Sequence, residues 1–140
     1  MRTLAPLAFV LAISAAYGFW YRRTRGRVVA KKAPESQPSG LTPAQIGVEL
    51  GTRGTLVQFS SAFCSPCRAT RALLTDITAD QPDIVHVDID AESHLELVRK
   101  LDIRSTPTTL ILDRNGVEIG RAVGAPKRDQ VISALAAIKL

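Results

Sequence analysis

The feature that most constrains this chain of 140 residues is a Cys-x-x-Cys sequence at the junction of two expected elements. Residues 55–59 are a short, mostly apolar run with β-branched members, which predicts a buried strand. From Cys67 to Thr78, Ala69, Leu73 and Ile77 recur at every fourth position, which predicts an amphipathic helix. A strand that leads through two cysteines into a helix favours an α/β fold.

The rest of the chain after residue 41 continues to alternate helices and strands. Thr42 and Pro43 suit the N-cap and the first turn of a short helix that ends near Leu50. Further along we expect strands at residues 84–89, 108–112 and 117–123, with an Asn115-Gly116 hairpin before the last, and helices at 92–101 and 127–138. Strands separated by helices imply a parallel unit, and the hairpin adds an antiparallel edge. We therefore predict a mixed central sheet with helices on both faces.

The first 40 residues differ in charge from the remainder. They hold seven Lys/Arg and one acidic residue, whereas residues 41–140 hold eleven Lys/Arg and twelve acidic residues. A nearly neutral domain argues against nucleic-acid binding, which needs a basic patch on the domain itself. No charge occurs from Thr3 to Tyr21, and a helix of this length reaches about 28 Å, close to the thickness of the bilayer core. We predict a transmembrane anchor at residues 1–21, a linker rich in basic, proline and serine residues at 22–40, and one domain at 41–140.

Charge bias predicts the orientation of this anchor. Upstream of the apolar stretch there is only Arg2 with the terminal amino group. Downstream there are six basic residues within twelve positions: Arg22, Arg23, Arg25, Arg27, Lys31 and Lys32. The positive-inside rule then predicts a single-pass protein with its domain in the cytoplasm. The alternative is a cleaved signal peptide with its apolar stretch at residues 4–13, which would place the domain outside the cytoplasm.

The position of the two cysteines at a helix start favours thiol chemistry. Cys64 would lie beside unpaired N–H groups of the helix N-terminus, which together with the helix dipole favour a thiolate. The pKa of cysteines in such motifs lies at about 3.5–7.5, against about 8.5 for a free cysteine. Pro66 suits the first turn, because its missing N–H would have no partner there. The pattern predicts thiol–disulfide exchange, in which Cys64 attacks a disulfide and Cys67 resolves the mixed intermediate.

Metal and organic cofactors are not expected. A structural zinc site needs two ligands besides the cysteines, and only His86 and His94 are available, at a spacing unlike that of zinc fingers. No glycine-rich dinucleotide motif is present in the sequence, so neither NAD(P) nor flavin is expected. The redox centre would be the Cys64–Cys67 disulfide itself.

Six short segments together resemble the thioredoxin family over roughly residues 43–140. They are Leu56-Val57-x-Phe59, Cys64-x-Pro66-Cys67, Val87-Asp88-Ile89-Asp90, Thr106-Pro107-Thr108, Asn115-Gly116 and Val123-Gly124-Ala125. The resemblance implies a thioredoxin-like fold at residues 41–140 and a protein-disulfide reductase that takes electrons from a thioredoxin-reductase-like partner. It also implies a cis peptide bond at Pro107 facing the cysteines, pairing of the Thr106 backbone with an extended substrate segment, and close approach of the substrate backbone at Gly124.

Two residues of the motif itself depart from the usual thioredoxin pattern. Phe63 stands where a tryptophan is usual, which keeps an apolar rim and loses the indole N–H donor. Ser65 replaces the usual glycine between the cysteines. Its hydroxyl either donates a hydrogen bond to the Cys64 thiolate or points into solvent, and the sequence favours neither.

A larger departure is expected beneath the motif. Gln58 replaces a buried aspartate that the family uses to move the proton of the second cysteine, and an amide takes up no proton at neutral pH. His86 stands where the family often has a lysine, and its unperturbed pKa of about 6.5 suits proton transfer. We hypothesise that His86 partly replaces the aspartate as the base for Cys67. The alternative is a polar residue of a central strand with a purely structural role.

Three functions follow from these observations. The first is a membrane-tethered protein-disulfide reductase that faces the cytoplasm and uses the Cys64-Ser65-Pro66-Cys67 motif. The second keeps this chemistry but places the domain outside the cytoplasm, in disulfide formation or cytochrome maturation. The third is a binding module that uses the fold as a scaffold without turnover.

Overall fold

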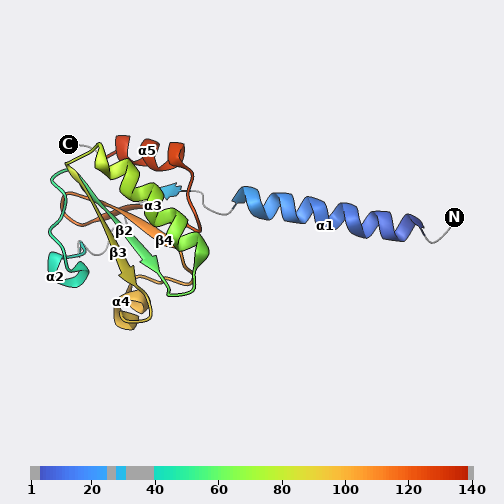
Figure 1. The fold of residues 1–140 in the computed structure, drawn as a ribbon, viewed down its shortest axis with the longest axis horizontal. Coiled ribbons are helices and arrows are strands. Elements are labelled where there is room, and N and C mark those ends of the chain that lie inside the picture. The colour runs from blue at the N-terminus through green and yellow to red at the C-terminus, as the bar shows by residue number, and fades with distance from the viewer. Residues whose placement is uncertain (1–3, 25–27, 31–39, 139–140) are drawn as a thin grey trace.

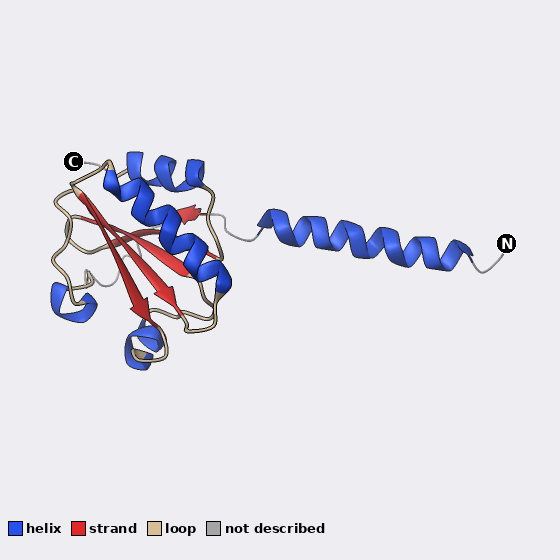
Figure 2. Ribbon diagram, in the orientation of Figure 1, coloured by secondary structure: helices blue, strands red, loops and turns tan. Residues whose placement is uncertain are grey.

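The computed structural model describes residues 4–24, 28–30 and 40–138 of the chain. The elements are α1 (Leu4–Thr24), β1 (Val28–Ala30), α2 (Pro43–Ile46), β2 (Gly54–Ser60), α3 (Ser65–Ala79), β3 (Ile84–Asp90), α4 (Leu95–Lys100), β4 (Thr108–Asp113), β5 (Glu118–Val123) and α5 (Arg128–Ala136). Figure 2 shows the strands at the centre of the domain with helices around them. The expected alternation of helices and strands over residues 41–138 is confirmed.

The described strands form one mixed sheet in the order β1-β5-β4-β2-β3. β2 and β3 run parallel and in register from Gly54 beside Ile84 to Ser60 beside Asp90. β4 is antiparallel to both β2 and β5. The helix α3 connects the two parallel strands, and a hairpin connects β4 to β5, as the sequence predicts.

Each face of the sheet is covered by helices, because alternate residues of its central strands point to opposite sides. One hydrophobic core joins Val57 and Phe59 of β2 to Ile46 of α2 and Leu97 of α4. The other core joins the sheet to α3 and α5 through Leu56, Leu74, Ile77, Ile111, Val131 and Leu135. Figure 1 shows α3 and α5 next to each other over the sheet. Cover on both faces explains why every residue of β2 is buried.

The hairpin between β4 and β5 turns at Asn115 and Gly116. The carboxylate of Asp113 accepts hydrogen bonds from the backbone N–H groups of Asn115 and Val117, at 2.8 and 2.9 Å. Gly116 has φ +77°, and a Cβ there would lie 2.1 Å from the carbonyl oxygen of Leu41. Glycine is therefore required at this position both by the backbone angle and by the close approach of the chain.

The N-terminal part differs from the prediction in two respects. α1 is a helix, yet within the described residues no helix is long and apolar enough to cross a membrane. The transmembrane anchor predicted at residues 1–21 is therefore not confirmed.

Part of the predicted linker belongs to the sheet. β1 pairs antiparallel with β5, with Val28 beside Ala122 and Ala30 beside Gly120. A strand of three residues is too short to show an alternating pattern, so the sequence gives no sign of it. The remainder of the linker with its proline and serine residues, at 31–39, lies outside the described residues.

Candidate active site

Both cysteines lie at the start of α3, where the strand β2 leads into the helix. Cys64 is the N-cap residue, and Pro66 lies in the first turn. The backbone N–H of Cys67 donates to the Sγ of Cys64 at 3.1 Å, so the sulfur has the place that a capping oxygen has in other helices. The two sulfurs are joined in a disulfide, with 5.2 Å between the Cα atoms. The partial positive charge at the N-terminus of α3 stabilises the thiolate form of Cys64 once the disulfide is reduced.

The two cysteines differ in exposure. Cys64 is half-buried, whereas only 1% of Cys67 is exposed. Phe63, beside them, is fully exposed and forms an apolar rim. A substrate therefore reaches the sulfur of Cys64, and Cys67 reacts from beneath it. This difference fits the expected order of attack and resolution.

Ser65 is also exposed, and its described contact is with α3 rather than with the disulfide. The guanidinium of Arg68 donates to the Ser65 hydroxyl oxygen at 3.4 Å. In this disulfide form the Ser65 side chain thus faces solvent beside Arg68.

A second loop carries the residues expected to hold substrate. The Thr106-Pro107 peptide bond is cis, which confirms the prediction. Gly124, with φ +88°, donates its N–H to the carbonyl oxygen of Pro107 at 2.8 Å. The hydroxyl of Thr106 lies 3.1 Å from that of Ser61, three residues before Cys64. These contacts join the cis-proline loop to the end of β5 and to the loop that leads into the motif.

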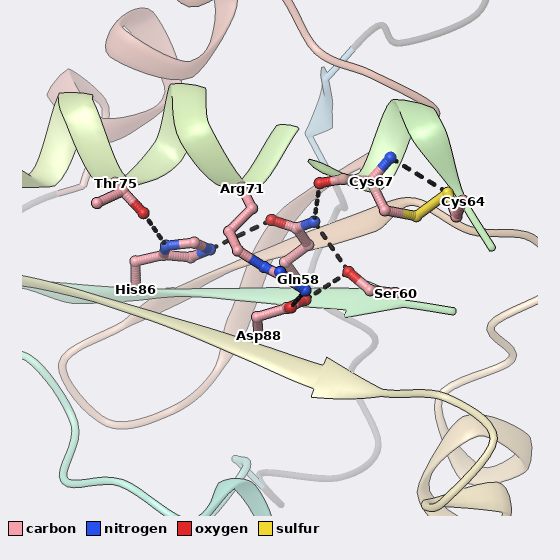
Figure 3. A network of polar contacts seen from close by, with 8 residues as sticks. All are labelled: Gln58, Ser60, Cys64, Cys67, Arg71, Thr75, His86 and Asp88. Carbon is pink, nitrogen blue, oxygen red and sulfur yellow. Dashed lines mark hydrogen bonds and ion pairs between the residues drawn. A yellow bond between two sulfur atoms is a disulfide. The ribbon is translucent and has the colours of Figure 1, made fainter. Parts of the chain in front are cut away.

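Gln58 lies beneath the motif and is fully buried. Its amide nitrogen donates to the carbonyl oxygen of Cys67 at 2.9 Å and to the hydroxyl of Ser60 at 3.0 Å. Its amide oxygen lies 3.3 Å from Nε2 of His86. Figure 3 shows the amide between the histidine ring and the cysteine turn. Gln58 thus fixes the first turn of α3 by hydrogen bonds, with both amide hydrogens already used.

These contacts define the state of His86. An amide oxygen only accepts, so Nε2 of His86 carries a hydrogen and donates to it. Nδ1 lies 3.4 Å from the hydroxyl of Thr75, which can donate or accept. Burial, rather than this contact, favours the neutral ring. Burial lowers the pKa of His86 most; the nearby carboxylate of Asp88 acts in the opposite direction, and Arg71 adds to the lowering. The described contacts of His86 lead to Gln58 and not to a sulfur, so they give no support to the hypothesis that His86 is the base for Cys67.

A carboxylate that the sequence reasoning did not single out lies on the same face. Asp88 of β3 accepts a hydrogen bond from the hydroxyl of Ser60 and forms an ion pair with Arg71 of α3 (Figure 3). Asp88, Ser60 and Arg71 line a cavity of about 370 Å³ together with both cysteines. The signal was present in the sequence, because positions 58 and 60 of one parallel strand and 86 and 88 of the next share a face.

Within the described ranges, no group of three or more His, Cys, Asp or Glu side chains is arranged to hold a metal ion.

The chain was compared with known proteins. The thioredoxin family profile matches residues 45–137. The chain is 36% identical over 74 residues to Thioredoxin H5 of Oryza sativa subsp. japonica, covering 53% of this chain and 54% of that protein. It is 30% identical over 77 residues to the thioredoxin of Chlamydia trachomatis serovar D, covering 55% of this chain and 74% of that protein. The match to the rice protein thus spans about half of that relative's length.

Solved structures show the same fold. Thioredoxin NaTrxh from Nicotiana alata superposes with a TM-score of 0.59 at 21% identity, over 77% of this chain and 100% of that one. Thioredoxin from Trypanosoma brucei brucei gives a TM-score of 0.58 at 20% identity, over 76% of this chain and 97% of that one. With the family profile extending over most of the domain and a Cys-x-x-Cys disulfide capping α3, the chain belongs to the thioredoxin family.

Proposed function

We propose that this protein is a thiol–disulfide oxidoreductase that reduces disulfides of protein substrates. The proposal rests on the arrangement of the two cysteines. Cys64 is half-buried at the N-cap of α3, and the buried Cys67 is joined to it by a disulfide. Such a pair supplies one sulfur that a substrate can reach and a second that only the first can reach. The thioredoxins that the chain resembles support the same activity.

The reaction consists of two exchanges and moves two electrons. In the reduced protein the Cys64 thiolate attacks one sulfur of the substrate disulfide, and the other substrate sulfur leaves as a thiolate that takes up a proton. Cys67 then loses its proton and attacks the sulfur of Cys64. The Cys64–Cys67 bond forms, and the second substrate sulfur leaves as a thiol. A thioredoxin-reductase-like protein would return the two electrons.

Substrate binding is proposed at the surface around Cys64. Phe63 offers an apolar contact, and the backbone of Thr106 beside cis-Pro107 is available to pair with an extended segment. Gly124, bonded to Pro107, presents no side chain to an approaching backbone.

A test of the activity uses insulin as the disulfide substrate and dithiothreitol as the electron source. We expect wild type to accelerate reduction and Cys64→Ser to abolish the acceleration. Cys67→Ser should instead accumulate a mixed disulfide with the substrate, because the resolving sulfur is missing. Equal rates for wild type and Cys64→Ser would contradict the proposal and favour a binding module.

We also propose that the N-terminal segment attaches the domain to a membrane, with the domain on the cytoplasmic side. The support is the uncharged stretch of the sequence from Thr3 to Tyr21, the six basic residues after it, and the exposure of apolar side chains along α1, such as Phe9 and Phe19 at 67% and 68%. Alkaline extraction of membranes should leave the full chain in the pellet. Recovery in the supernatant would contradict the attachment.

The direction of the reaction has its own test. The reduction potential of the Cys64–Cys67 pair should lie near that of reductants, at about −270 mV, rather than near that of strong oxidants, at about −120 mV. A potential at the oxidising end would favour the alternative in which the domain acts outside the cytoplasm in disulfide formation.

A further inference from the structure

We propose that Asp88 accepts the proton that Cys67 loses when it resolves the mixed disulfide. The inference rests on the oxidoreductase function proposed above and adds the proton acceptor to it. It concerns only the second exchange, since Cys64 is stabilised as a thiolate by the helix end.

The site needs a proton acceptor that Gln58 cannot provide. Cys67 is 1% exposed, so solvent reaches its sulfur poorly. Gln58, which lies directly below, is an amide and has both hydrogens engaged with Cys67 and Ser60. Beside it, His86 is hydrogen-bonded through both ring nitrogens, and neither bond leads to a sulfur.

Asp88 is placed to do what Gln58 cannot. Its side chain is 19% exposed and lines the cavity of about 370 Å³ that the two sulfurs also line. A water molecule needs only about 10–15 Å³ of such space, so one has room to carry a proton between Cys67 and the carboxylate. The carboxylate is held in position by the Ser60 hydroxyl from β2 and by Arg71 from α3.

A hydrogen-bond chain also links the carboxylate to the cysteine turn. The Ser60 hydroxyl donates to Asp88 and accepts from Gln58, which in turn donates to the carbonyl oxygen of Cys67. Both of its ends are acceptors, so this chain fixes the position of the carboxylate relative to the cysteine turn, and the proton itself passes through water in the cavity. Arg71, Arg68 and Asp90 are the charged groups that share the cavity with it, and the neutral ring of His86 lies on its own strand.

The proposed step balances as follows. The S–H bond of Cys67 breaks, the proton passes through a water molecule to the Asp88 carboxylate, and the Cys67 electron pair forms the bond to the sulfur of Cys64. The Cys64–substrate bond breaks, and the substrate sulfur leaves with that electron pair. Asp88 then gives its proton to solvent, or to the leaving thiolate where that thiolate is basic enough to take it, so the carboxylate is regenerated.

The test is single-turnover reduction of 5,5′-dithiobis(2-nitrobenzoic acid) by the pre-reduced full chain. This probe releases one coloured thiolate when Cys64 attacks and a second when Cys67 resolves, so the two exchanges are measured separately. For Asp88→Asn we expect an unchanged first release. The second release should be slower by at least tenfold near neutral pH, since a positioned base contributes about 10²–10⁴. The difference should disappear well above the free-cysteine pKa of about 8.5, where Cys67 ionises unaided.

Two further variants complete the experiment. Asp88→Glu keeps a carboxylate and should restore much of the rate of the second release at neutral pH. If Asp88→Asn does not fold, Asp88→Glu still tests the proposal. Asp90→Asn removes a carboxylate that lines the same cavity but bonds the backbone N–H of Glu92 and the side chain of Ser93. It should leave the second release unchanged.

The proposal is overturned if Asp88→Asn resolves as fast as wild type at neutral pH, or slows equally at every pH, as a structural defect would. It is also overturned if Asp90→Asn slows the second release as much as Asp88→Asn does. Wild type that shows no first release would instead contradict the oxidoreductase function itself, so the two failures are distinguishable.

Discussion

Gln58 shows how one substitution changes the chemistry beneath the disulfide. A carboxylate at this position would face the carbonyl oxygen of Cys67, which is an acceptor, whereas the amide donates to it at 2.9 Å. The amide therefore stabilises the first turn of α3 and leaves proton transfer to another group. It also fixes the neighbouring His86 in one neutral tautomer.

The neutral state of His86 predicts a pH dependence of stability. Burial lowers the pKa of His86 below its ordinary value of about 6.5, so as pH falls the unfolded chain takes up this proton before the folded one. Stability therefore decreases as pH falls below about 6.5. When pH is lowered from about 7.5 to about 5.5, we expect the free energy of unfolding, measured with urea, to decrease less for His86→Gln than for wild type.

The matched control for this measurement is His94→Gln, which removes the other histidine, an exposed residue before α4. It should keep the wild-type dependence on pH. An identical dependence in wild type and His86→Gln would contradict the tautomer and the burial described above.

At the scale of elements, the sequence predicted every element of the domain after residue 41 from hydrophobic period and turn residues. The central strand β2 shows why. Val57 and Phe59 enter one core and Leu56 enters the other, so apolar side chains occur at adjacent positions of the strand. The same reasoning could not find β1, because its three residues form a strand only through their backbone pairing with β5. It also missed Asp88 as a site residue, since its partners Ser60 and Arg71 come from two other elements.

The pairing of β1 with β5 is testable in the full chain. Val28→Pro/Val29→Pro removes two backbone donors and fixes φ at both positions, which is incompatible with a regular ladder. Along residues 120–122, N–H groups alternate between β1 and β4, and those that point toward β1 should then exchange faster with solvent. Those of β2, in the centre of the sheet, should not change. Equal exchange at residues 120–122 in both proteins would show that β1 does not protect this edge.

At the scale of the whole molecule, the sheet separates two cores, and the one beneath α3 supports the site. Leu74 is fully buried there, on the helix whose first turn carries Cys67. We expect Leu74→Ala to lower the free energy of unfolding by about 2–5 kcal/mol, the range for emptying a well-packed leucine site. Thermal or urea unfolding of the oxidised protein measures this.

Leu95 of α4 is the control for this substitution, because it is 52% exposed. Leu95→Ala should change stability by less than about 0.5 kcal/mol. Similar losses for the two variants would mean that α3 is not held by the core described here.

The position of β1 at one edge of the sheet also has a mechanical consequence. β1 follows α1 in the chain and is held by three residue pairs, while β2 and β3, which carry Ser60 and Asp88, lie at the opposite side of the sheet. Tension applied through the N-terminus would therefore load the β1–β5 edge of the sheet before it reached the strands beneath the sulfurs.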